Sequence, residues 1–191
     1  MPRIPLVSEA SMTDTQRRVY DTMMNGPRRS PPVGPLAAAM HCPDLAEKWS
    51  ELGVVLRFNS GFEPRLREFV ILLIGRYWDC EFEWYSHEDQ ARRAGVSEQT
   101  IETLRYGGCR FGRSDEQAIH NYAVELLRNH RASDETYQRI LDAYGTAGIV
   151  ELTALIGYYV MVALTLNAHG IGVPDGVSSP LPILPSSGAA D

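Results

Sequence analysis

The sequence predicts an all-helical protein. Helix-capping residues, apolar runs and breaker residues recur along the 191 residues, and no window of four or more residues shows strand-like alternation between hairpin turns. Apolar residues make up 44% of the chain and charged residues 22%, as in ordinary globular proteins. The length predicts a single domain, which we expect to comprise residues 1–178, followed by a flexible Pro- and Ser-rich tail over residues 179–191.

Three helices are predicted in the N-terminal part of the chain. Thr13 and Gln16 form a capping box that opens the first helix, which ends before the loop 26–35 (GPRRSPPVGP). This loop contains too many prolines to be helical. Proline in the first turn opens the other two helices, which run over about 43–57 and 64–77.

Further helices are expected over about 79–93, 97–105, 114–129, 133–144 and 148–168. Ser114 with Gln117 forms a second capping box, and Ser133 caps the helix that ends before Gly145. The last helix lies in the most apolar stretch of the chain. Polar residues such as Glu151 interrupt it, so we interpret it as a buried helix of a soluble bundle rather than a membrane span.

Charge and cysteine content narrow the possible functions. The net charge is −6, Lys48 is the only lysine, and no basic stripe is present, which argues against nucleic-acid binding. Three cysteines without a Cys-x-x-Cys spacing argue against a secreted disulfide framework. With no secretory signal at the N-terminus, the expected location is the cytoplasm.

A short internal similarity recurs at an offset of 82 residues. Ile74–Tyr77 (IGRY) matches Ile156–Tyr159 (IGYY), and His87 matches His169 at the same offset. A duplicated helical hairpin would explain this similarity, with each glycine allowing close helix packing.

The segment around Cys80, Glu83 and His87 is the strongest candidate for chemistry. Their spacing of i, i+3 and i+7 places them within about 60° of one another on a helix. Cys80 would lie in the first turn, where the helix dipole lowers a thiol pKa. Glu83 can hydrogen-bond to His87 and raise its basicity, which is a general-base arrangement. Glu68 lies in an apolar run, where a carboxylate needs a partner.

Structural interpretations of the same residues stay open. A Glu–His pair at i, i+4 is common on solvated surfaces, and a single cysteine such as Cys80 is often a packed apolar residue. His169 would suit a buried core position. It would equally suit a second site in the repeated hairpin, at the place that matches His87. As zinc ligands, Cys80, Glu83 and His87 are an incomplete and unusual set, so no metal site is expected.

Two blocks carry a family resemblance. They are residues 66–104 (LREFVILLIGRYWDCEFEWYSHEDQARRAGVSEQTIETL) and 150–170 (VELTALIGYYVMVALTLNAHG), together with the loop 26–35. From about Arg3 to Pro182 the chain resembles the carboxymuconolactone decarboxylase family, in the alkylhydroperoxidase-D-like superfamily. The resemblance implies a helical bundle of that type with a repeated helical hairpin. It also implies a homo-oligomer, which could be a dimer, trimer or hexamer.

The resemblance also implies site residues. Redox members of the superfamily carry a Glu, a Cys-x-x-Cys pair and a His. Glu68, Cys80 and His87 stand at the matching places here, but Glu83 occupies the second cysteine position. A dithiol cycle needs a resolving thiol, so this departure points to the non-redox branch, which includes the decarboxylases.

We therefore expect a cofactor-free lyase that removes CO₂ from a small carboxylated cyclic, lactone-like substrate. His87 would be the acid and base, with Glu83 as its orienter and Glu68 as a further member of the relay. Arg28 or Arg29 would bind a substrate carboxylate. The other candidate substrate-binding residues are Tyr77, Trp84 and His169.

Two alternatives remain open at the level of the sequence. One is an antioxidant hydroperoxide reductase that uses Cys80 as its single peroxidatic thiol, with an external reductant. The other is a non-catalytic helical oligomer that binds a small apolar or aromatic ligand. The aromatic cluster that includes Tyr77 and Trp84 is equally compatible with core or interface packing.

Overall fold

The structure, a computed structural model, describes residues 1–184, and within that range it contains helices and no strands, which confirms the all-helical prediction. A short 3-10 helix, η1 (Glu9–Ser11), precedes the α-helices. These are α1 (Asp14–Asn25), α2 (Pro35–Ala39), α3 (Pro43–Phe58), α4 (Pro64–Tyr77), α5 (Glu81–Ala94), α6 (Glu98–Arg105), α7 (Ser114–Asn129) and α8 (Asp134–His169).

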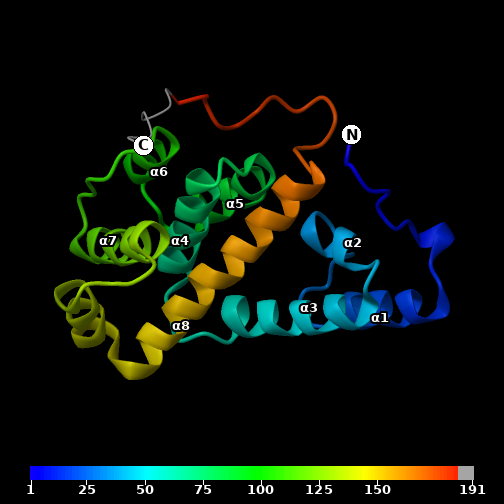
Figure 1. Ribbon diagram of the computed structural model, residues 1–191, viewed down its shortest axis with the longest axis horizontal. Coiled ribbons are helices and arrows are strands. Elements are labelled where there is room, and N and C mark those ends of the chain that lie inside the picture. Colours follow the sequence, from blue (N-terminus) through cyan, green and yellow to red (C-terminus); the bar gives the residue numbers. More distant parts are fainter. Residues whose placement is uncertain (185–191) are drawn as a thin grey trace.

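Helix α4 forms the centre of the fold. Every residue from Glu68 to Arg76 is buried, as expected for a helix that is apolar on nearly all sides. It pairs with α5 and also contacts α6, α7 and α8. Helix α8 crosses the molecule between the α4–α5 pair and the group formed by α1, α2 and α3 (Figure 1).

Several predicted helix boundaries are confirmed. The capping box of Thr13 and Gln16 is present at the start of α1. Proline stands in the first turn of both α3 and α4, and these helices end within a residue of the predicted positions. Ser97 and Ser133 cap α6 and α8 through their hydroxyls.

Other local predictions are wrong. The capping box at Ser114 does not form, because Arg113 is the N-cap residue of α7 and the side chain of Gln117 instead bonds to the backbone of Phe111 and Cys109. The short helix α2 was not predicted. The predicted break at Gly145, in contrast, is confirmed, because Gly145 has a non-helical backbone (φ 67°, ψ −179°) and α8 consists of two helical segments that meet there at a kink.

The two stretches of internal similarity differ in local structure. The first, 74–87, crosses the turn between α4 and α5, whereas the second, 156–169, lies within α8. Gly75 packs closely against α5, since a Cβ there would lie 3.6 Å from the Trp84 backbone nitrogen. A Cβ at Gly157 would meet no atom within 4 Å. Close packing at glycine is therefore a feature of the first stretch alone.

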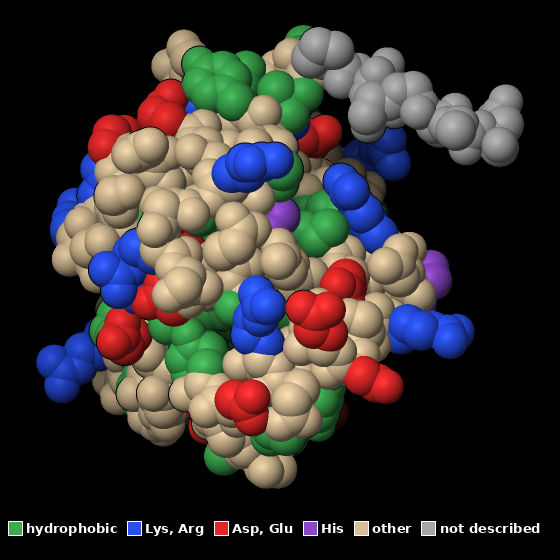
Figure 2. Space-filling view, turned by 90° about the vertical axis from the view of Figure 1, so that its left-hand side faces the viewer, with side chains coloured by type: hydrophobic (Ala, Val, Ile, Leu, Met, Phe, Trp, Pro, Cys, Tyr) green, Lys and Arg blue, Asp and Glu red, His purple; other side chains and the backbone are tan. Residues whose placement is uncertain are grey.

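Helix α8 is long and apolar enough to cross a membrane by length and composition. Half of its most apolar window is buried within the fold, a property shared by core helices of soluble proteins. Acidic and basic side chains are interspersed on the face of the molecule shown in Figure 2.

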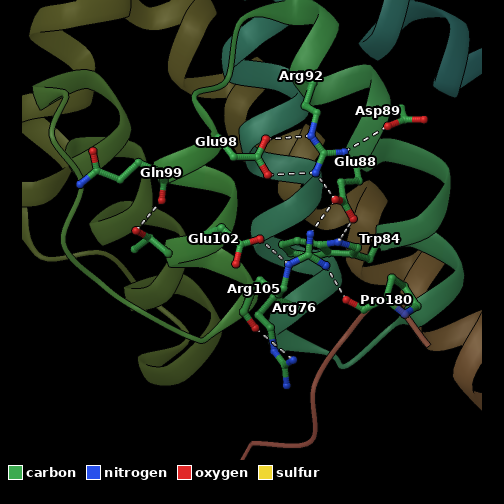
Figure 3. Close-up of polar contacts among 11 residues, drawn as sticks. Arg76, Trp84, Glu88, Asp89, Arg92, Glu98, Gln99, Glu102, Arg105 and Pro180 are labelled. Atoms are coloured by element: carbon green, nitrogen blue, oxygen red, sulfur yellow. Dashed lines mark hydrogen bonds and ion pairs between the residues drawn. The ribbon is translucent and has the colours of Figure 1, made fainter. Parts of the chain in front are cut away.

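An ion-pair network joins α5 to α6. Glu88 accepts hydrogen bonds from Arg92, Arg105 and the indole of Trp84 (Figure 3). Burial tends to raise the pKa of Glu88, but these donors outweigh burial and lower the pKa. Arg92 also pairs with Glu98 of α6. The network therefore ties α5 to α6.

Part of the predicted tail is held by the same network. Arg105 donates a hydrogen bond to the carbonyl of Pro180, within the described segment 179–184 (Figure 3). Residues 185–191 of the predicted flexible tail lie outside the described residues.

The proline-rich loop is anchored at Gly34, just before α2. Gly34 adopts a φ of 54°, and a Cβ there would lie 2.4 Å from a ring carbon of Phe82 on α5. A side chain at this position would therefore meet both backbone strain and a clash.

We expect Gly34→Ala to lower the free energy of unfolding by roughly 1–3 kcal/mol, because the backbone strain and the Phe82 clash add together. Urea denaturation followed by circular dichroism would measure the change. Gly112→Ala is the matched control, since a Cβ at Gly112 meets nothing within 4 Å. Equal loss in both variants would contradict the anchoring role of Gly34.

Candidate active site

A cavity of about 190 Å³ lies where the loop 26–35 meets α3, α5 and α8. Its polar lining comes from all of these segments, namely Arg28 and Ser30 of the loop, Arg57 of α3, Glu83, Ser86, His87 and Gln90 of α5, and Tyr158 and Tyr159 of α8. Two arginines, a histidine and a carboxyl group in one small cavity can bind an anionic molecule and exchange a proton with it.

His87 lies between two glutamates. Its Nδ1 atom is hydrogen-bonded to Oε2 of Glu68 on α4 at 2.6 Å, and its Nε2 atom lies 3.2 Å from Oε1 of Glu83, one turn earlier in α5. Glu68, Glu83 and His87 are only 9%, 3% and 5% exposed, respectively. The structure brings together the three residues that the sequence grouped. However, Glu68 rather than Glu83 makes the hydrogen bond that orients the ring.

Glu83 has an unusual environment. Its buried Oε1 has no hydrogen-bond partner among the described residues, because the contact with His87 lacks hydrogen-bond geometry. Burial raises the pKa of the Glu83 carboxyl, and the nearby Glu68 raises it further. Positive charges on His87, Arg57 and Arg28 lower it only in part, so the pKa stays above its ordinary value. Burial therefore shifts the Glu83 carboxyl toward its neutral, protonated form relative to an exposed glutamate.

Arg28 reaches the cavity from the proline-rich loop. Its Nη2 atom donates a hydrogen bond to the Tyr158 hydroxyl at 3.2 Å, and its Nε atom is buried with no partner within residues 1–184. Gly53 of α3 provides the space, since a Cβ there would lie 2.3 Å from both the Arg28 Nη2 atom and the Tyr158 hydroxyl. The neighbouring Arg29 is exposed and does not line the cavity.

Arg57, Tyr158 and Tyr159 line the cavity but were not among the predicted site residues. Arg57 donates to Gln90 at 2.9 Å, and the Tyr159 ring packs edge-on against His87, with centroids 5.7 Å apart. Burial raises the pKa of both tyrosines, so their hydroxyls remain neutral donors. The sequence could have indicated Tyr158 and Tyr159 as site residues. Two adjacent tyrosines in an apolar helix place hydroxyl groups in the interior, where they require hydrogen-bond partners.

Cys80 is not part of the cavity lining. It is the N-cap residue of α5 rather than a residue of the first turn, and it is only 1% exposed. Burial raises the pKa of its thiol to about 12, although the backbone N–H of Glu83 acts in the opposite direction. The expectation of a thiol activated by the helix terminus is therefore wrong, because the loss of hydration outweighs the dipole.

Three predicted substrate-binding residues lie outside the cavity. Trp84 is fully buried in the core, where its indole donates to Glu88 at 2.6 Å. Tyr77 is 37% exposed at the end of α4. His169 lines a different cavity, together with Cys42 and other residues.

No group of three or more His, Cys, Asp or Glu side chains within residues 1–184 is arranged to hold a metal ion. Cys80, Glu83 and His87 therefore do not form such a group, even though Glu83 and His87 are in contact.

Residues 43–124 match the model of the carboxymuconolactone decarboxylase family. Over these residues the chain is similar to that family. This confirms the resemblance over residues 43–124, and the all-helical structure agrees with the alkylhydroperoxidase-D-like fold. No curated protein matches the chain. The matched segment contains Glu68, Glu83 and His87, whereas Arg28 lies outside it.

The raised pKa of Glu83 has a consequence for stability. In the unfolded chain the carboxyl ionises near its ordinary pKa of 4.5, whereas in the folded chain it holds its proton to higher pH. The unfolded state therefore binds fewer protons, and the contribution of Glu83 to stability falls as the pH rises from about 4.5 through the raised pKa.

We expect Glu83→Gln to remove this penalty, so that the variant gains stability relative to the wild type as the pH rises from 5 to 8. Urea denaturation across this range would measure the difference. Asp89→Asn is the control, since Asp89 is an exposed carboxylate on the same helix. An identical pH dependence in the wild type and Glu83→Gln would contradict this account.

Proposed function

We propose that the protein is a cofactor-free enzyme that decarboxylates a small carboxylated cyclic substrate of the lactone type. The observation that supports this most is His87, which is held by Glu68, contacts Glu83 and lies in a cavity lined by two arginines. The arrangement combines an anion-binding wall with a proton-transfer group. The match of residues 43–124 to the carboxymuconolactone decarboxylase family supports this class of chemistry.

The proposed reaction has three steps. Arg28 binds a substrate carboxylate, for which a guanidinium is well suited. Loss of CO₂ then leaves an electron pair that is delocalised onto the lactone carbonyl, and Arg57 with the hydroxyl of Tyr159 stabilises the developing oxyanion. Finally, the carbon is protonated from the side of the cavity formed by Glu83 and His87.

We expect Arg28→Gln to raise the KM for a carboxylated unsaturated lactone by about 10- to 100-fold, because a hydrogen bond to a charged group contributes roughly 1.5–3 kcal/mol. A spectrophotometric assay of lactone consumption and CO₂ release would measure it. Arg29→Gln is the matched control and should leave KM close to the wild-type value, since Arg29 does not line the cavity. Equal effects of the two changes would contradict the proposed carboxylate site.

The structure gives little support to the hydroperoxide-reductase alternative. Cys80 is buried and its thiol pKa is raised to about 12, whereas a peroxidatic cysteine must be an accessible thiolate. Cys42 and Cys109 are exposed, and no disulfide joins them within the described residues. In the non-catalytic alternative, the same cavity would bind a ligand without turnover. The lactone assay therefore distinguishes a decarboxylase, which consumes the lactone, from a ligand-binding protein, which does not.

We also propose that the chain self-associates through α8. One side of this helix presents exposed or half-buried apolar and small residues at heptad-like spacing, namely Val150, Ala154, Gly157, Met161 and Leu164. Val150 is 62% exposed and Leu164 is 46% exposed. A second copy of the same uncharged stripe is a suitable partner, because helices pack closely through such apolar faces.

We expect Leu164→Glu to shift the chain toward the monomer, since two facing stripes would then bury carboxylates. Size-exclusion chromatography with light scattering at micromolar concentration would measure the mass. Leu52→Glu is the control, because Leu52 is equally exposed (45%) but belongs to α3. A wild-type monomer would refute the proposed assembly.

A further inference from the structure

The two glutamates that flank His87 have different positions relative to the cavity. Glu68 forms no part of the cavity lining, whereas Glu83 and His87 both do. Because Nδ1 of His87 is hydrogen-bonded to Glu68, only Nε2 can face Glu83. Glu83 therefore lies at the cavity beside Nε2 of His87, whereas Glu68 bonds to the other ring nitrogen and does not line the cavity.

Two buried polar atoms at this cavity lack hydrogen-bond partners within the described residues. They are Oε1 of Glu83 and Nε of Arg28. A buried polar group without a partner is costly, so each such group in a native structure calls for an explanation. A ligand in the cavity that offers a proton acceptor to Glu83 and an anionic group to Arg28 would satisfy both atoms.

We propose that Glu83, in its protonated form, gives the proton to the substrate, and that His87, held in place by Glu68, restores the proton to Glu83. This assignment rests on the proposed decarboxylation. After the bond to CO₂ breaks, its electron pair remains on the substrate. The substrate carbon takes a proton from the Glu83 carboxyl, which becomes a carboxylate. His87 then passes a proton from solvent to Glu83, so that one proton is consumed for each CO₂ released.

The groups packed around Glu83 suit both of its protonation states. They are Arg28 of the loop, Arg57 of α3, Glu68 of α4, His87 of α5, and Tyr158 and Tyr159 of α8. Burial favours the neutral acid before the reaction. The two guanidinium groups and the imidazole stabilise the carboxylate that forms when the proton leaves. In this arrangement Glu83 is a catalytic residue and Glu68 is a positioning residue.

Infrared difference spectroscopy would test the stored proton without any substrate. At neutral pH, the wild type should show a carboxylic-acid C=O band that is lost in Glu83→Gln. The band should remain in Glu68→Gln and in the exposed control Asp89→Asn. Its absence from the wild type, or its persistence in Glu83→Gln, would overturn the proposal.

Turnover of the carboxylated lactone provides the second readout. Glu83→Gln should lower kcat by about 100-fold or more, which is typical for loss of a general acid. Glu83→Asp should restore part of the rate with a shifted pH profile, and circular dichroism would confirm that both variants fold. An unchanged kcat in Glu83→Gln would overturn the assignment while leaving the decarboxylation intact. A wild type with no turnover would instead overturn the proposed function, and the infrared band would still decide whether Glu83 stores a proton.

Discussion

The burial of α4 is the constraint on which the rest of the structure depends. Its apolar run, from Phe69 to Ile74, forms the centre of the core, so α5, α6, α7 and α8 pack around it. Glu68 belongs to this helix and is only 9% exposed, and a carboxylate in such a place needs a partner. The turn between α4 and α5 brings His87 to it. The orientation of the imidazole is therefore a direct result of how the core is packed.

The same core contains charged groups of a different kind. Arg65 pairs with Asp115 and Glu116, and this network satisfies the fully buried Glu116 carboxylate. At the cavity, in contrast, Glu83 and Arg28 each carry a buried atom without a hydrogen-bond partner among the described residues. A network in which every charge is paired, such as that of Arg65, can be present for its contribution to stability alone. The unpaired polar atoms of Glu83 and Arg28 instead reduce the stability of the protein without a ligand, so their presence at a cavity is better explained by ligand binding.

Local sequence rules predicted much of the fold and the centre of the site. The sequence alone could predict the contact between Glu83 and His87 and the unusual position of Glu68. Both follow from helix periodicity, through the i, i+4 spacing of the first two residues and the place of the Glu68 carboxylate in an apolar run. Arg57 could not be predicted, since only tertiary packing brings it to the cavity. The tyrosines of α8 gave a signal as buried hydroxyls, but their place at the cavity also depends on tertiary packing. Cys80 shows the opposite case, in which a sound local argument failed because burial outweighed the helix dipole.

The cavity is assembled from two parts of the chain with different roles. The residues proposed to transfer the proton, such as His87, lie within residues 43–124, the segment that matches the family. Arg28 and the Tyr158–Tyr159 pair come from outside that segment and form the facing wall. In the proposed reaction this wall would contact the substrate without taking part in the Glu68–His87 hydrogen bond, so changes in it should alter which molecule binds and leave the orientation of the imidazole intact. The match to the family model therefore bears on the type of chemistry, and we expect the loop and α8 to determine the substrate.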